Sequence, residues 1–285
     1  VPRRSVLAGG AGAAVLAPLT IVGDLAGAAP APATAQASKF RHGVASGDPK
    51  PRAVVLWTRV TPTKAATPGS GKGPKVTVRW EVATDARFKR VVRRGEVVTG
   101  PRSDHTVKVD AKGLKPGRWY YYRFLLGGVA SPVGRTRTAP RKRADVQRLR
   151  VGVVSCSQYT VGYFAAYRHL AGHPGLDAVI HLGDYLYEGG NKSDGVRAHE
   201  PPREILSLSD YRQRHAQYKS DPDLQLLHAT VPFIVTWDDH EVTNDSWATG
   251  AENHDPGEGD YQARKARAHR AYDEWMPVRM DGTAR

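Results

Sequence analysis

The sequence predicts a β-sandwich domain followed by a layered α/β domain, and three observations support this fold class. Residues 40–140 contain short runs of strand-favouring residues separated by Gly, Pro and Ser turns. From Arg148 onward, apolar runs typical of buried strands alternate with segments that read as helices. Residues 139–147, between the two patterns, are polar and basic, as expected of a linker. A length of 285 residues suits about two domains.

The first segment, residues 1–37, has the features of a bacterial export signal. Arg3-Arg4 precede a weakly apolar Ala- and Gly-rich stretch, and Ala35-Gln36-Ala37 resembles a cleavage site before Ser38. A twin-arginine start of this kind addresses a protein to the Tat export machinery. The stretch is too short and too weakly apolar to span a membrane, and no other segment is a candidate. We therefore expect a secreted or cell-envelope protein without stable membrane insertion.

The second unit, residues 38–140, is predicted to be an immunoglobulin- or fibronectin-like sandwich. Its expected strands are residues 54–60, 75–82, 106–109 and 119–124. The turn Gly113–Gly117 directly before the Tyr-rich strand is typical of the tyrosine corner found in such sandwiches. The acidic and histidine side chains of this unit are isolated along the sequence, so we expect no catalytic cluster here.

The third unit, residues 141–285, places reactive residues directly after three apolar runs. These runs are residues 150–154, 177–180 and 232–237. Helices are expected at residues 162–171, 209–229 and 260–276. Ligands bind at the carboxyl ends of strands in open α/β sheets. We therefore expect the three polar clusters that follow the runs to form one site.

Asp184 follows the second run within His-Leu-Gly-Asp-Tyr-Leu-Tyr-Glu, residues 181–188. Its carboxylate, the phenols of Tyr185 and Tyr187 and the carboxylate of Glu188 offer oxygen ligands to a hard cation. On its own, this octet fits equally well a turn that is capped by Asp and packed by Tyr.

Cys156 is the only cysteine and follows the first run. It cannot form an internal disulfide, and a lone thiol in an oxidising compartment is exposed to oxidation unless it is buried or bound. One interpretation is a small buried hydrophobic residue. Its position at a strand end favours the other, a thiolate metal ligand.

The third run ends in Asp238-Asp239-His240-Glu241. Like charges this close repel one another unless a cation or a proton neutralises them. The alternative is an acid-rich helix N-terminus. Repetition of the same strand-end pattern favours a metal site, to which Asn244 and Asp245 would add oxygen atoms.

The composition limits the partners. A net charge of +14 favours anionic partners, such as phosphate esters or cell-wall polyanions. The basic residues are not interleaved with aromatic residues as on a nucleic-acid platform, so no specific nucleic acid is expected. Thiolate and phenolate ligands suit iron, whereas carboxylates suit Ca²⁺, Mg²⁺ or Mn²⁺.

Several motifs together resemble the PhoD-type alkaline phosphatases and phosphodiesterases, within the calcineurin-like metallophosphoesterase class. They are Phe40–Pro49, Ser155-Cys156-Ser157, Gly183–Glu188, Tyr211–His215 and Trp237–Glu241. The resemblance extends over essentially all of the chain after residue 37. It implies that residues 141–285 are the N-terminal part of an α/β metallophosphoesterase domain of the α-β-β-α type.

The resemblance also implies a two-metal site that holds Fe³⁺ and Ca²⁺, with other divalent cations as substitutes. Asp184 would bridge the two cations, and Tyr187 and Cys156 would bind the ferric ion. Asp239 would bind Ca²⁺, and Asn244 is a weaker candidate for the same cation.

The implied activity is hydrolysis of phosphodiesters and phosphomonoesters through a metal-bound hydroxide, for phosphate scavenging. His240 would contact the phosphate or the leaving group, as both a catalytic and a substrate-binding residue. Family members continue well past this length and carry later Asp and His ligands. We therefore expect a C-terminally truncated chain with an incomplete set of ligands and little or no activity.

Two rival hypotheses remain open at this point. One is a basic β-sandwich protein that binds cell-wall polyanions without catalysis, for which binding would be salt-sensitive and independent of metal. The other is a metal hydrolase that acts on a non-phosphate ester.

Overall fold

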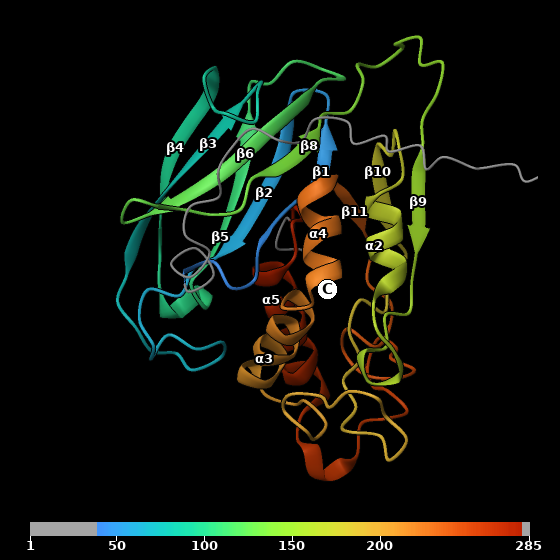
Figure 1. Cartoon of the computed structure of the whole chain (residues 1–285). Coiled ribbons are helices and arrows are strands. Elements are labelled where there is room, and N and C mark those ends of the chain that lie inside the picture. The colour runs from blue at the N-terminus through green and yellow to red at the C-terminus, as the bar shows by residue number, and fades with distance from the viewer. Residues whose placement is uncertain (1–38, 281–285) are drawn as a thin grey trace, which may run out of the picture.

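The computed structural model describes residues 39–280, which form two β-sheets and a group of helices that packs beside them (Figure 1). The predicted export signal at residues 1–37 lies outside this range. Within residues 39–280, no helix has both the length and the apolar character needed to cross a membrane.

The first sheet has six strands in the order β5-β2-β1-β11-β10-β9, and the second has β4-β3-β6-β7 with β8 paired to β6. The strands of the N-terminal half are β1 Val44–Lys50, β2 Ala53–Arg59, β3 Val76–Ala83, β4 Val91–Thr99, β5 Thr106–Lys112, β6 Trp119–Leu126, β7 Val129–Ala130 and β8 Gly134–Arg137. The remaining strands are β9 Val151–Val154, β10 Ala178–His181 and β11 Phe233–Val235. The helices are α2 Ala165–Ala171, α3 Leu208–Lys219, α4 Pro222–Thr230 and α5 Tyr261–Trp275, with short 3₁₀ turns at Pro101–Ser103, Tyr159–Val161 and Pro256–Glu258.

The N-terminal strands form a sandwich around one apolar core. Strand β6 alternates half-buried and buried residues along its length, the period-2 pattern of a strand with one face in a core. Its inward residues Tyr122 and Phe124 share a buried cluster with Val54 and Leu56 of the opposite sheet. The backbone N–H of Lys115 donates to the hydroxyl of Tyr120 at 2.9 Å, which is the contact expected of the predicted tyrosine corner.

Strand β1 connects the two halves of the chain. It pairs antiparallel with β2 and parallel with β11, where Gly47 lies opposite Phe233. A Cβ atom at Gly47 would lie 2.3 Å from the carbonyl oxygen of Pro277 and 2.8 Å from that of Phe233, so this pairing requires glycine. Residues 38–140 and 141–285 therefore contribute strands to one continuous sheet.

The α/β half contains three parallel strands whose carboxyl ends lie side by side. His181 of β10 is in register with Val235 of β11 and with Val154 of β9. Tyr167 of α2 and Leu224 of α4 belong to the same buried cluster as Val179 and Phe233, so these two helices cover one face of the strands.

The helix expected at residues 209–229 is in fact two helices, so that prediction was wrong in detail. Helix α3 begins after Ser207, whose side chain accepts from the backbone N–H of Asp210. It ends at Lys219, and Asp221 then caps α4 with Pro222 in its first turn. A proline cannot continue a helix without losing a hydrogen bond, so the Asp221-Pro222 pair separates the two. Strands β1, β4, β7 and β8 were not expected.

Candidate metal centre

The loops after β10 and β11 approach each other closely because of two unusual backbone positions. Gly183 has φ +114° and Asp184 has φ +52°. A Cβ atom at Gly183 would lie 2.5 Å from Cβ and 2.6 Å from the backbone N of Asp238, so only glycine permits this approach. Asp is one of the few non-glycine residues that adopt the left-handed region readily. The Gly-Asp pair in the sequence is therefore suited to this turn.

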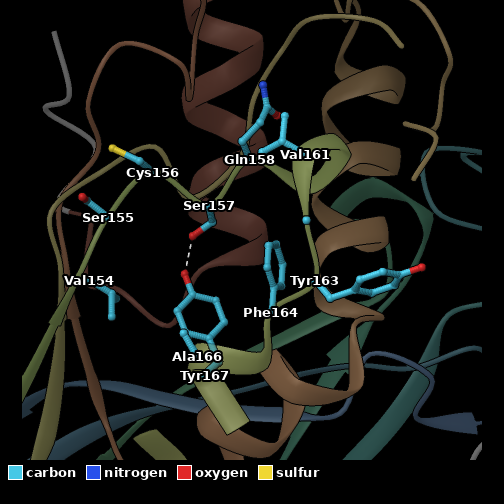
Figure 2. A pocket seen from close by; sticks show the side chains of 11 residues that line it. Val154, Ser155, Cys156, Ser157, Gln158, Val161, Tyr163, Phe164, Ala166 and Tyr167 are labelled. Carbon is cyan, nitrogen blue, oxygen red and sulfur yellow. Dashed lines mark hydrogen bonds between the residues drawn. The ribbon is translucent and has the colours of Figure 1, made fainter. Parts of the chain in front are cut away.

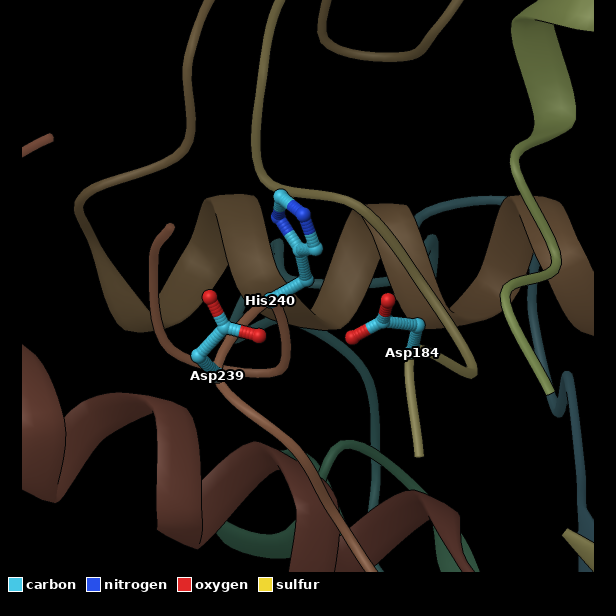
Figure 3. Close-up of side chains that lie close together, drawn as sticks. All are labelled: Asp184, Asp239 and His240. Atoms are coloured by element: carbon cyan, nitrogen blue, oxygen red, sulfur yellow. The ribbon is translucent and has the colours of Figure 1, made fainter. Parts of the chain in front are cut away.

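Asp184, Asp239 and His240 form a group that could hold a metal ion (Figure 3). Each offers one ligand atom, and these atoms all lie within 4.8 Å of one another. The Oδ1 atom of Asp184 is buried and has no hydrogen-bond partner, whereas its Oδ2 accepts from the hydroxyl of Tyr187 at 3.0 Å. A buried carboxylate oxygen without a donor is costly, and a cation would satisfy it. The donor set therefore fits a cation that prefers oxygen and imidazole ligands.

Glu188 holds the imidazole of His240. Its Oε2 lies 2.7 Å from Nδ1 of His240, and its Oε1 accepts from the backbone N–H of Asn244 at 2.7 Å. Burial opposes ionisation of Glu188, but the hydrogen bond and charge of His240 outweigh it and lower the Glu188 pKa to about 2. Burial likewise opposes the charged form of His240, but Glu188 outweighs it and raises the His240 pKa. With Nδ1 directed to Glu188, Nε2 is the nitrogen left for a ligand.

Tyr187 lies between the acidic group and Cys156. Its ring packs against His240 with centroids 4.2 Å apart. Burial raises the pKa of Tyr187 well above its usual value, and the nearby charge of Asp184 adds to this shift. The phenol is therefore protonated, and a metal that binds its oxygen must displace the proton.

Cys156 lies on the loop after β9, with φ +58°. Its backbone N–H donates to the carbonyl of Gly183 at 3.2 Å, and that of Ser157 donates to the carbonyl of Asp184 at 2.8 Å. These bonds fix the loop after β9 beside the loop after β10. The thiol is exposed, so the alternative of a small buried packing residue is wrong.

A pocket of about 340 Å³ opens beside Cys156 (Figure 2). Ser155, Cys156 and Gln158 contribute polar atoms, and Val161, Tyr163 and Phe164 contribute apolar walls. At its base, the hydroxyls of Ser157 and Tyr167 are hydrogen-bonded to each other.

Two predicted residues have other contacts. Asn244 donates through its side-chain amide to Oε2 of Glu252 at 2.8 Å, so its amide nitrogen is directed toward that carboxylate. Tyr185 is buried, and its hydroxyl lies 2.8 Å from Nε2 of His228, away from the acidic group. The sequence assigned no task to Glu241, yet its carboxylate accepts backbone hydrogen bonds from both loops.

Both halves of the chain are similar to known proteins. A family model described as PhoD-like phosphatase matches residues 151–285, and one described as PhoD-like phosphatase, N-terminal domain, matches residues 26–140. Alkaline phosphatase D of Bacillus subtilis (strain 168) is 46% identical over 249 residues, which are 85% of this chain and 42% of that protein. A solved structure of PhoD superposes with a TM-score of 0.79 at 44% identity, over 87% of this chain and 48% of that chain. The chain thus spans less than half the length of either relative.

Proposed function

The chain belongs to the PhoD-like phosphatase family, and from this premise we propose that it forms part of an exported, metal-dependent phosphoesterase. The complete protein would hydrolyse phosphodiesters and phosphomonoesters for phosphate scavenging. The observation that carries the proposal is the convergence of Asp184, Asp239 and His240, with ligand atoms within 4.8 Å of one another, around a buried and unpartnered oxygen of Asp184.

In this proposal, Fe³⁺ and Ca²⁺ are held by Asp184, Asp239, Cys156 and Tyr187, with Asn244 as a further oxygen donor. Bound cations would supply Lewis-acid stabilisation of the phosphoryl oxygens and a nucleophile at neutral pH. The donor types fit this assignment, because thiolate and phenolate suit iron and carboxylates suit calcium.

His240 is proposed to contact the phosphate or the leaving oxygen. Its Nδ1 is held by Glu188 at 2.7 Å, and the raised pKa of the imidazole favours the protonated form. A protonated Nε2 could donate a proton or a hydrogen bond to the departing oxygen. The net charge of +14 would attract an anionic ester to this edge of the sheet.

Export through the Tat machinery, to the cell envelope or the outside, is part of the same proposal. It is supported by Arg3-Arg4 and the small residues before Ser38. Phosphate-containing cell-wall polyanions are candidate substrates or partners in that compartment, since they are anionic esters.

The first experiment is the metal content of the purified chain from Ser38 onward, beside Cys156→Ser and the exposed neighbour Ser155→Ala as a matched control. We expect iron and calcium in the parent and in Ser155→Ala, and loss of iron in Cys156→Ser. The natural longer protein should then hydrolyse a phosphodiester in a metal-dependent manner. Metal-free protein at both lengths, or salt-sensitive polyanion binding without metal dependence, would reject the phosphoesterase.

A further inference from the structure

We propose that Glu241 is the positioning residue that holds the loops after β10 and β11 together, so that Asp184 and Asp239 meet. The expected consequence of this loop closure is tighter metal binding, and that part of the inference rests on the proposed metal-dependent function. Its structural part, the closure of the two loops, concerns hydrogen bonds that exist without a metal.

The contacts of Glu241 join two segments that are far apart in the sequence. Its Oε2 accepts from the backbone N–H of Asp184 at 3.1 Å and from that of Asp238 at 2.8 Å. Its Oε1 accepts from the backbone N–H of Tyr185 at 2.5 Å. One carboxylate thus binds backbone groups on both sides of the proposed metal site.

The environment of Glu241 makes these bonds consequential. Glu241 is only 2% exposed, so water cannot readily replace it as the acceptor for the three amides. A buried N–H group without an acceptor is destabilising, so three of them would favour separation of the loops. Gly183 permits the close approach of the loops but supplies no side chain to hold it.

Glu241 acts on the backbone and does not belong to the group of ligand atoms formed by Asp184, Asp239 and His240. The neighbouring Asp238 offers a comparison, since its own side chain is exposed and only its backbone N–H takes part. A variant at Asp238 therefore changes the local charge while leaving all three backbone bonds intact.

The test compares Glu241→Gln with Asp238→Asn as a matched control. Gln has the size of Glu, but only one of its two terminal atoms accepts hydrogen bonds, so one or more of the three amides must face an NH₂ group. We expect Mn²⁺ affinity, measured by calorimetry, to fall roughly 10- to 100-fold in Glu241→Gln, as for other residues that orient metal ligands. Asp238→Asn should stay within a few-fold of the parent.

Amide hydrogen exchange of the metal-free chain separates this inference from the proposed function. In Glu241→Gln, the amides of Asp184, Tyr185 and Asp238 should exchange faster, while those of Val179 in β10 stay protected. Unchanged exchange at the three amides, or undiminished Mn²⁺ affinity, would overturn the inference. A parent chain that binds no Mn²⁺ but shows the exchange effect would reject the metal-dependent function and support loop closure by Glu241.

Glu241→Asp is the second variant in case Glu241→Gln does not fold. It keeps the carboxylate but is one methylene shorter, so it cannot reach both loops at once. It should reproduce the exchange effect at the three amides, and full protection in this variant would also overturn the inference.

Discussion

Two polar clusters meet at Tyr185 and differ in how their charges are balanced. The edge cluster consists of Asp184, Asp239, Glu241 and the neighbouring His240, at the carboxyl ends of the strands. The interior cluster consists of Lys219, His228 and His215, on α3 and α4. Tyr185 donates its backbone N–H to Glu241 and places its hydroxyl 2.8 Å from Nε2 of His228.

The interior cluster consists of basic side chains that lie close together. The Nζ atom of Lys219 lies 3.1 Å from Nε2 of His228 and packs over the rings of Trp57 and Tyr185 at 4.7 and 5.1 Å. Among the ion pairs of residues 39–280, none includes Lys219. Burial lowers the pKa of Lys219 and of His228 well below their usual values.

The position of a cluster of like charges in the fold decides how these charges are neutralised. At the edge, a cation from solution can balance the carboxylates of Asp184 and the half-buried Asp239, whereas the buried Glu241 is neutralised by a proton because burial raises its pKa. In the interior, burial disfavours the charged forms of Lys219 and His228, so these basic groups give up their protons instead. A cluster of like-charged side chains therefore indicates a binding site in the first region and a neutral core in the second.

The largest expected effect comes from removing one carboxylate at the edge. Asp184→Asn keeps the size of the side chain, and Asn tolerates the φ of +52°. The buried Oδ1 of Asp184 would lose its charge, so Mn²⁺ affinity should fall at least about a hundredfold, or about 2.7 kcal/mol. Calorimetry measures the Mn²⁺ affinities of Asp184→Asn and of the control Asp238→Asn. If the two affinities lie within threefold of each other, the edge cluster does not need a cation to balance its carboxylates, and the proposed difference between the two clusters is wrong.

The second effect concerns the interior. Lys219→Met replaces a buried amine with an apolar chain of similar length, and the Tyr185 hydroxyl remains as a partner for His228. Burying a polar group costs free energy that an apolar side chain avoids, so we expect a gain of about 1–3 kcal/mol in the free energy of unfolding in urea. The exposed Lys192→Met is the control, with a change within about 0.5 kcal/mol. A clear loss of stability in Lys219→Met would mean that the interior uses the lysine as a cation over Trp57.

The sequence predicted the edge cluster better than the interior cluster, for a physical reason. Apolar runs that end in Asp184 and Asp239 follow the strand-end rule for α/β sheets, which needs only local pattern. The task of Glu241 depends on backbone groups from a loop more than 50 residues away and has no local signal. Cys156 and Asn244 remain predictions as metal ligands.

Helix α3 shows why the interior was missed. Its residues, Leu-Ser-Asp-Tyr-Arg-Gln-Arg-His-Ala-Gln-Tyr-Lys, are largely polar, a pattern typical of an exposed helix, yet Arg214, His215 and Lys219 are buried. The guanidinium of Arg214 is satisfied by carbonyl groups of the loop before α3, including those of Gly189 and Pro201. Tertiary hydrogen bonds of this kind override the binary pattern on which the prediction depends. The parallel pairing of β1 with β11 is equally long-range.

The smallest effect is a difference in the pH dependence of stability, which has opposite signs in the two clusters. Burial lowers the pKa of His215 to about 3. Below pH 6.5 the unfolded chain therefore binds a proton that the folded chain does not, and stability falls with pH until about pH 3. Burial raises the pKa of Glu241 from 4.5 to about 8. The contribution of Glu241 to the free energy of unfolding is therefore fully present below pH 4.5, the value of the unfolded chain, and is lost as the pH rises toward 8.

His215→Phe tests the pH dependence of stability that is expected from the interior cluster. Both ring nitrogens of His215 are buried without partners, and its ring stacks on Trp275, so Phe should fit without losing a hydrogen bond. Between pH 6 and pH 4, the free energy of unfolding should fall less steeply in His215→Phe than in the parent, by up to about 1.4 kcal/mol per pH unit. The exposed His173→Gln should keep the parent slope. Equal slopes in all three proteins would show that His215 can be protonated in the folded chain, and the interior would then tolerate charge much as the edge does.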